Sequence, residues 1–505
     1  MRKFFPPLFI LNLLFTSALL LGQEVVLTVT TTANSGAGSL REAFAITGDL
    51  KRIVFDPILS GETITITSPL LNLGQTTIDA STAGGLTIDA SGSEDRIFEN
   101  TAGGTLTLNS LNLTGGSPNS SGAAIRNLNN SNLNIENCCI YGNSTNNAGA
   151  IANESRSTLT MTNSTLARNT ARFGGALICV DSTTILTHVT IADNTGTNGT
   201  AGIVQGTGIL TLSGCIISNT NSNLGNPDLG GGDGMVIASS PNFIRSGPGN
   251  FQSFFNNDVS HVLGSVDNPI ESYLAPLGDY GGPTLTMVPL SNSPAIDGFP
   301  ASAIATDQRG FNITDGSHDL GAAEHGINNI LVDTIEDEII DNDTLSLREA
   351  IMAAGPNALI EFDPTVFDGS QAPITLFSEL LIGSSLAIIA SNIPSGVTID
   401  GGGNGDFIAD EDETRCFCIN DNIGALQEVV FNKLIIQNGS YGGGPAGANI
   451  HNLENLTIDT CQILDGRAFG NEAQGGGIYN ENGSLTLTIN PAINQAACLS
   501  FDDVK

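Results

Sequence analysis

The stretch from Gly104 to Asn219 decides the fold, because an aliphatic residue followed three positions later by Asn recurs in it. The repeats read Ile140-Tyr-Gly-Asn143, Leu166-Ala-Arg-Asn169, Ile191-Ala-Asp-Asn194 and Ile216-Ile-Ser-Asn219, with steps of 26, 25 and 25 residues. A second aliphatic column has steps of 26 residues: Ile125, Ile151, Leu177 and Ile203. A third, looser column follows: Leu106, Leu133, Leu159 and Leu210.

Around these columns apolar and polar residues alternate, as in Leu133-Asn-Ile135 and Leu159-Thr-Met161. Alternation is the period of a strand with one face buried and one exposed. Asn, Gly, Ser and Thr fill the segments between strands, and such residues favour turns. Two or three short strands per repeat predict one coil of a parallel β-helix, an all-β solenoid whose coils stack at roughly 4.8 Å.

A single coil would not be stable alone. Its four to six inward side chains contribute roughly 1.5–3 kcal/mol each, whereas ordering the backbone costs roughly 1–2 kcal/mol per residue. Stacked coils share one core, so we expect the array to fold as a unit. A leucine-rich repeat would show its consensus and a helical segment, and a propeller blade would need about 40 residues.

Composition excludes several classes of partner. The chain has 505 residues and a net charge of −34, with 17 basic against 51 acidic residues. This charge argues against binding to nucleic acid or anionic membranes, and against a deep cationic cleft for polyanionic sugars. Solubility of a large secreted surface is the simpler explanation of the charge.

Residues 1–22 resemble a secretory signal peptide. Arg2 and Lys3 form the positive start, an apolar run extends from Leu8 to Leu21, and Gly22-Gln23 is the expected cleavage point. The run is short for a membrane span, and we predict no membrane-spanning segment after it. The sequence therefore predicts a secreted or cell-surface protein.

The chain is a duplication. Ser39-Leu-Arg-Glu-Ala43 returns as Ser346-Leu-Arg-Glu-Ala350, an offset of 307 that Phe55-Asp-Pro and Phe362-Asp-Pro share. Ser followed three residues later by Glu is a capping box, so each copy predicts a short amphipathic helix that caps an open coil end. We expect module 1 over 23–326, with long loops over 220–273 and a C-terminal cap region at 274–326. Module 2 is expected over 327–505 and looks truncated, with few coils.

At these residues the sequence resembles two known groups of bacterial surface proteins. The Ser-Leu-Arg-Glu-Ala segments are similar to the CSLREA-domain motif, although Gly38 and Leu345 replace its Cys. Four further segments resemble the choice-of-anchor Q region of the same proteins: Leu277-Gly-Asp-Tyr-Gly-Gly-Pro283, Ser293-Pro-Ala-Ile-Asp297, Thr306-Asp-Gln-Arg-Gly310 and Asp319-Leu-Gly-Ala322. The repeats are also similar to those of chlamydial polymorphic outer-membrane proteins. These resemblances imply a right-handed, pectate-lyase-like β-helix on an exported protein, and no known activity.

The eight Cys residues do not predict a disulfide framework. Cys139 and Cys215 share a repeat column with Thr165 and Thr190 between them, so they would lie three coils apart, too far to bridge. Most of the Cys residues are interpreted as small buried apolar residues. No His lies at zinc-ligand spacing from them.

Candidate catalytic residues are weighed against a structural role. Asp79, Asp89 and Asp400 each follow an Ile in a predicted strand. The residues after each Asp are typical of turns, so a turn-forming role is favoured over a catalytic one. Asp181 and Asp193 have His188 nearby, and His188 occupies the repeat position of Asn137, Asn163 and Ser213, which predicts an outward polar residue. No spacing supports a nucleophile–base pair, so no catalytic residue is assigned.

The repeated Asn143, Asn169, Asn194 and Asn219 are predicted to stack at a tight turn, adopt the left-handed conformation and pass hydrogen bonds between coils. Ca²⁺ is the one ion with candidate ligands, because oxygen-rich loops suit it. The candidates are Asp406, Asp410 and Asp412, which alternate with Glu411 and Glu413. A second acidic run comprises Asp333, Glu336, Asp337, Glu338, Asp341 and Asp343. For both runs a solvated acidic loop is favoured.

The sequence leaves three alternative hypotheses for the function of the protein. The first is a non-catalytic secreted or cell-surface β-helix protein for adhesion or surface display, with an extracellular glycan or a surface protein as partner. The second is a carbohydrate-active enzyme, a polysaccharide lyase or glycoside hydrolase, on the same scaffold. The third is a purely structural envelope component. Acids and a basic residue converging in a groove would favour the enzyme.

Overall fold

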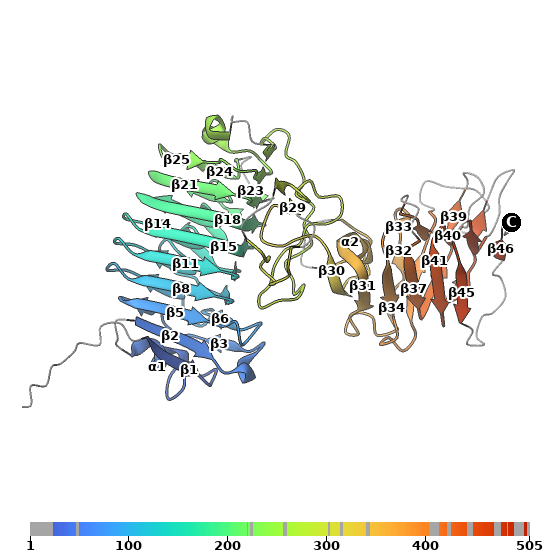
Figure 1. Cartoon of the computed structure of the whole chain (residues 1–505), viewed down its shortest axis with the longest axis horizontal. Helices are drawn as coiled ribbons and strands as arrows, with labels where there is room; N and C mark the ends of the chain where they lie inside the picture. Colours follow the sequence, from blue (N-terminus) through green and yellow to red (C-terminus); the bar gives the residue numbers. More distant parts are fainter. Residues whose placement is uncertain are drawn as a thin grey trace, which may run out of the picture.

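A computed structural model shows a parallel β-solenoid of about 16 turns with only short helices (Figure 1). It describes residues 24–46, 50–219, 221–222, 226–255, 260–300, 304–313, 317–339, 344–402, 414–421, 426–441, 448–468, 476–481, 483–488 and 499–501. The segment predicted to be a signal peptide lies outside these residues. The prediction of an all-β parallel helix is confirmed.

Each coil of the first stack turns through three faces, and each face is a column of parallel strands. The first face comprises β1 (Val25–Val29), β2 (Leu50–Phe55), β5 (Gln75–Asp79), β8 (Thr105–Asn109), β11 (Asn132–Glu136), the first halves of β15 (Thr158–Ala167) and β18 (Ser182–Ala192), β21 (Gly208–Ser213) and β25 (Met235–Ile237). The second face comprises β3 (Thr63–Thr65), β6 (Thr87–Asp89), β9 (Asn112–Thr114), β12 (Cys139–Tyr141), the second halves of β15 and β18, β22 (Ile216–Ser218), β26 (Phe243–Ile244) and β27 (Val262–Leu263).

The third face closes each coil. It comprises β4 (Leu70–Asn72), β7 (Phe98–Asn100), β10 (Ile125–Asn127), β14 (Ile151–Glu154), β17 (Leu177–Val180), β20 (Ile203–Gln205) and β24 (Leu229–Gly231). Between the second and third faces lie four short strands: β13 (Ser144–Ala148), β16 (Thr170–Phe173), β19 (Thr195–Gly196) and β23 (Asn221–Ser222). Within the segment 220–273, predicted to be long loops on later coils, the described strands β24 to β27 therefore continue the stack.

The second stack repeats this plan. Its first face comprises β30 (Ile327–Val332), β31 (Ala354–Phe362), β34 (Leu386–Ile389), β37 (Glu428–Asn432), β41 (Asn455–Asp459) and β45 (Leu485–Thr488). Its second face comprises β32 (Ile374–Thr375), β35 (Val397–Asp400), β38 (Leu434–Gln437) and β42 (Gln462–Leu464). Its third face comprises β33 (Leu380–Ile382), β36 (Phe417–Ile419), β40 (Ile450–Asn452), β44 (Ile478–Asn480) and β46 (Leu499–Phe501). Between these two faces, at a corner, lie β39 (Ser440–Tyr441) and β43 (Arg467–Ala468).

The aliphatic columns of the sequence lie inside the stack, as predicted. Ile125, Ile151, Leu177 and Ile203 are register partners on the third face and are 0–1% exposed. One assignment was wrong: Ile191 pairs with Ile217, not Ile216. Ile216 points outward and is nevertheless buried, so both residues look like core residues in the sequence.

The same shift corrects the Cys column. Cys139 pairs with Thr165, and Thr165 pairs in turn with Thr190, which pairs with Ile216 rather than Cys215. Among the described Cys residues none forms a disulfide, and all but Cys418 are buried. Burial strongly raises the pKa of the Cys139 thiol, which fits a small apolar packing residue better than a nucleophile.

Both predicted capping helices are present. In α1 (Leu40–Ala45) the Ser39 side chain accepts from the Glu42 amide, and Leu40, Ala43 and Phe44 are buried. In α2 (Leu347–Ala353) the capping box is complete, because Glu349 also accepts from the Ser346 amide at 2.9 Å. Short 3₁₀ turns η1 (Pro57–Leu59) and η2 (Gly249–Phe255) complete the helical elements, and η2 packs Phe251 and Phe255 against the last coil of the first stack.

A long segment that we call the strap (residues 272–300, 304–313 and 317–326) runs beside the second face of the first stack, between the two stacks (Figure 1). It contains the antiparallel pair β28 (Phe299–Pro300) and β29 (Ser317–His318). Sequence analysis expected a C-terminal cap here. The described strap residues instead cover outward-facing apolar residues along the stack: Cys139, Ala167, Ala192, Ile216 and Phe243.

Candidate functional site

The three aspartates considered as catalytic candidates hold turns. Asp79, Asp89 and Asp400 each accept the backbone N–H two residues ahead, at 3.0, 2.8 and 2.9 Å. This is the Asx-turn geometry that the structural interpretation predicts. Asp79 also accepts from Arg52 at 2.5 Å. Burial acts to raise the pKa of Asp79, but hydrogen bonds from Ser81 and Arg52 outweigh it and lower this pKa.

The side chain of His188 points away from the coil, as predicted, but it does not face solvent, because the strap covers it and it is 3% exposed. Its ring lies 4.8 Å from that of Phe299 and 5.3 Å from that of His318. Burial, together with the neighbouring His318, lowers the pKa of His188 to about 4. In the next coil the position equivalent to Asn137, Asn163 and His188 is Gly214, not Ser213 as predicted. Ser213 pairs with Thr187, the residue before His188.

The predicted asparagine ladder is confirmed. Asn143, Asn169 and Asn194 each donate from the backbone N–H and from Nδ2 to the Oδ1 of the next Asn, at 3.0 Å. Asn219 donates in the same way to Asp228 at 3.1 Å. The predicted left-handed conformation belongs instead to the residue before each of the first three Asn, with φ values of 63°, 54° and 55° at Gly142, Arg168 and Asp193.

A second buried ladder was missed by the sequence analysis. Asn72, Asn100 and Asn127 each donate from Nδ2 to the Oδ1 of the next Asn in the series, which ends at Asn153. These residues close the third-face strands and are 0–2% exposed. The signal was present, because each Asn comes two residues after a buried apolar residue: Leu70, Phe98, Ile125 and Ile151.

The predicted calcium ligands Asp406, Asp410 and Asp412 lie outside the described residues. In the described part of the second acidic run Glu336 is exposed, as predicted for a solvated loop, but Asp333 and Asp337 have structural roles. The Asp337 side chain is 2% exposed and pairs with Arg348 of α2 at 2.7 Å, and Asp333 accepts from the Leu345 amide at 2.6 Å. Among the described residues no group of three or more His, Cys, Asp or Glu side chains is arranged to hold a metal ion.

The strap is fixed to the stack by the Thr306-to-Gly310 motif. Thr165 of β15 donates to Gln308 Oε1 at 2.7 Å, and Gln308 Nε2 donates to Thr284 Oγ1 and the Leu285 carbonyl at 2.9 and 2.8 Å. Arg309 and Asp307 form a buried pair at 2.7 Å, with both side chains at most 2% exposed. Gln308 therefore docks the strap on the stack, whereas the Asp307–Arg309 pair stabilises the strap itself.

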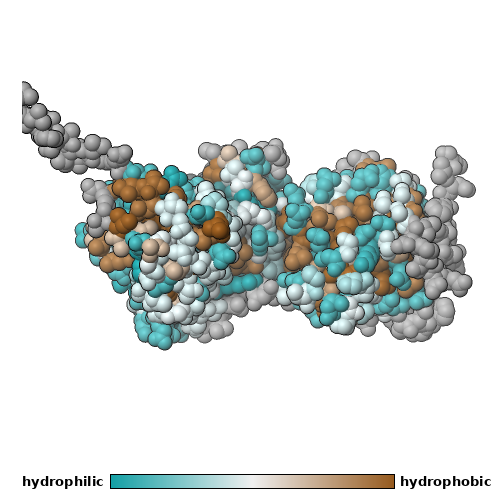
Figure 2. Space-filling view, turned by 90° about the horizontal axis from the view of Figure 1, so that it is seen from below, coloured by the Kyte–Doolittle hydropathy of each residue, from teal (hydrophilic) through white to brown (hydrophobic). Residues whose placement is uncertain are grey.

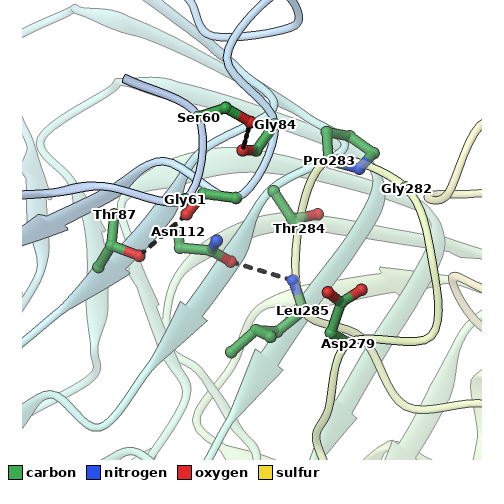
Figure 3. A pocket seen from close by; sticks show the side chains of 11 residues that line it. Ser60, Gly61, Gly84, Thr87, Asn112, Asp279, Gly282, Pro283, Thr284 and Leu285 are labelled. Carbon is green, nitrogen blue, oxygen red and sulfur yellow. Dashed lines mark hydrogen bonds between the residues drawn. The ribbon is translucent and has the colours of Figure 1, made fainter. Parts of the chain in front are cut away.

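A cleft of about 520 Å³ opens where the strap meets the first coils (Figure 3). One wall is formed by the turns at Ser60-Gly61 and Gly84-Gly85 with Thr87 and Asn112, and the other by strap residues 279 and 282–285. Backbone bonds join the walls, because the Gly85 amide donates to Pro283 at 2.8 Å and the Leu285 amide donates to Asn112 Oδ1 at 3.1 Å.

The cleft has few strongly polar groups. Asp279 lies at its edge and accepts from the Gly281 amide at 3.0 Å, and it is the only charged residue among the described lining residues. Ser60 donates to the Gly84 carbonyl at 2.8 Å. The Asn112 side chain extends from the floor between Thr87 and the strap (Figure 3). This arrangement can accept and donate hydrogen bonds, but it does not bring a second carboxylate or a base beside Asp279.

Comparisons with known proteins do not name a family: no protein-family description matches the chain, and no curated protein is significantly similar to it in sequence. In the part of the chain that the structure describes, no helix has the length and apolar character needed to span a bilayer.

Proposed function

We propose that the chain is a non-catalytic, secreted or cell-surface β-helix protein that serves adhesion or surface display. The observation that carries the proposal is the use of its acidic and basic groups. Asp79, Asp89 and Asp400 hold turns, Asp307–Arg309 fixes the strap, and Asp337–Arg348 fixes the second cap. Groups that could perform acid–base chemistry are thus used to build a rigid scaffold.

The outer surface supports a binding role. Outward positions of the first face hold small polar residues that are half-buried or exposed: Thr105, Thr107, Asn132, Asn134, Thr158, Thr160, Thr183 and Thr211. Apolar side chains gather in separate patches on both stacks (Figure 2). Leu71 and Leu381 occupy the centre of the first third-face strand in each stack and are 51% and 57% exposed. Exposed apolar patches are typical of interaction sites.

The alternative is a polysaccharide lyase or glycoside hydrolase. The cleft carboxylate Asp279 favours it, but a typical glycosidase needs two carboxyl groups about 5–9.5 Å apart. Asp279 is the one carboxylate among the described residues that line the cleft.

The test compares binding with cleavage, using the full-length protein. The protein is applied to a glycan array and to immobilised extracellular proteins, and is separately incubated with polysaccharides while new reducing ends and unsaturated products are measured. We expect saturable binding without product. Product formation that Asp279→Asn abolishes would establish the enzyme and overturn the proposal.

A further inference from the structure

The cleft at the strap exists only when two distant parts of the chain are docked. Its lining residues come from coils at positions 60–112 and from the strap at positions 279–285. The close approach depends on glycines, since Gly61 has φ +74° and the Cβ of a larger residue at Gly85 would lie 3.2 Å from Gly61 Cα. The result is a shallow site with a backbone-lined floor and fixed walls.

The polar groups of the cleft retain unused hydrogen-bonding capacity. The side-chain hydrogen bonds of Asn112 and Asp279 engage only Oδ1 of each, with the Leu285 and Gly281 amides. Asn112 Nδ2 can therefore donate, and Asp279 Oδ2 can accept, toward a molecule in the cleft. The apolar surfaces of Leu285 and Pro283 lie beside them. A carboxylate acceptor, an amide donor and a small apolar surface match the hydroxyl-rich face of a sugar.

Charge narrows the class of sugar. The described lining residues include no Lys, Arg or His, and the one charged residue is the acidic Asp279. The whole chain carries −34, so sulfated, phosphorylated and uronic sugars would be repelled. A neutral hexose presenting two hydroxyls to Asp279 has no such penalty.

We infer that this cleft is the glycan-recognition site and that it binds a neutral hexose unit. The inference rests on the proposed adhesive function and specifies its ligand. Because the strap supplies one wall, binding also stabilises the docked strap by mass action. Exchange of the Gly85 and Leu285 amides, which bond across the cleft, slows when the sugar is present.

The test uses full-length variants that keep the structural bonds. Asp279→Asn retains an Oδ1 for the Gly281 amide but loses the charge, and Asn112→Asp retains an Oδ1 for Leu285 but loses the donor. Gly84→Gln fills the cleft, because a Cβ there meets only Pro283 Cα at 3.6 Å. The matched control is Asp363→Asn in the second stack, where the carboxylate holds the same kind of turn, with Thr365 at 2.7 Å.

Binding is measured on an array of neutral and acidic glycans and by titration with the best neutral glycan. We expect each cleft variant to bind at least about tenfold more weakly, as expected for a lost hydrogen bond to a charged or well-positioned group. Asp363→Asn should bind like the wild type, and thermal unfolding should show that all four variants fold.

Two results would overturn the inference and separate it from the proposed function. If the wild type binds neutral glycans and the cleft variants bind equally well, the site lies elsewhere and adhesion stands. If the wild type binds no neutral glycan but does bind an extracellular protein, the ligand class is wrong and adhesion again stands. Binding of neither class contradicts both.

Discussion

His188 offers the sharpest test of how the strap is held. It lies in the corner between the first and second faces, where Asn137 and Asn163 occupy the coils below with the same left-handed backbone. His188→Asn therefore introduces the residue that this corner already accommodates. The change removes the one imidazole of the stack that packs against Phe299 and His318 of the strap.

The expected magnitude follows from the pKa shift. The pKa of His188 is lowered from 6.5 to about 4 by burial and by His318. The unfolded chain therefore binds more protons than the folded chain between these values, so the free energy of unfolding falls as the pH falls through that window. At 1.36 kcal/mol per pKa unit, the loss is about 3 kcal/mol at about pH 4. His188→Asn should remove this part of the acid sensitivity.

The wild-type pH profile cannot isolate this effect, because Asp228 titrates in the opposite sense. Burial raises the pKa of Asp228 to about 6, so its folded form binds the extra proton and acidification favours folding. Site-resolved hydrogen exchange at the strap removes the contribution of Asp228. Burial also raises the pKa of Asp319 in the strap, but Asp319 is common to the wild type and the variant, so their difference reports His188. The Gly321 and Ala322 amides bond to Gly214 and Thr190 at 2.7 and 2.9 Å and report strap docking.

In the wild type we expect the protection of these two amides to fall between about pH 6.5 and about pH 4, after correction for intrinsic exchange. In His188→Asn the fall should be absent or much smaller. His451→Asn, in the second stack, serves as the control and should behave like the wild type. An unchanged acid-induced fall in His188→Asn would refute the argument and place the sensitivity in another group.

Three further predictions concern the scaffold. Asn194→Ala leaves both donors of Asn169 without their acceptor, so the free energy of unfolding in urea should fall by about 2–4 kcal/mol. Arg348→Ala leaves the Asp337 side chain buried without its cationic partner, with the Phe377 amide as its remaining donor, and should cost about 3–5 kcal/mol; an unchanged urea midpoint would contradict this. Between about pH 4 and about pH 6, wild type should lose stability relative to Asp228→Asn as the pH rises, and a flat difference would show that burial does not shift this carboxyl.

Much of the fold could be predicted because the core is periodic. The Ile125 column, both Ser-Leu-Arg-Glu-Ala caps and the Asn143 ladder depend on contacts between adjacent coils, which recur at a fixed spacing along the chain. The Arg of each Ser-Leu-Arg-Glu-Ala segment also makes equivalent contacts in the two modules. Arg41 donates to the Ser68 carbonyl at 2.6 Å, and Arg348 donates to the equivalent Ser378 carbonyl at 2.6 Å. In each module this Arg ties the capping helix to the next coil.

The errors arise where a non-repeating segment covers the repeat. Ile216 was misassigned, and the burial of the outward His188 was missed, because the strap makes outward positions apolar or buried, which removes the alternation that distinguishes inside from outside. The cleft was not predictable for the same reason. Its two walls come from residues 60–112 and 279–285, and even the Asn112–Leu285 bond between them has a sequence separation of 173, so no spacing rule connects them.

The strap also joins the two stacks. This role explains why so many of its polar groups form hydrogen bonds. The Ser291 amide donates to Met352 of α2 at 2.8 Å, and Arg309 donates to Gly326 at 3.2 Å, just before β30 begins. On the opposite side Gln308 bonds to Thr165 of the first stack. Buried, fully bonded polar side chains allow little alternative geometry, so the motif from Thr306 to Gly310 stabilises one arrangement of strap and coils, and with it the walls of the cleft.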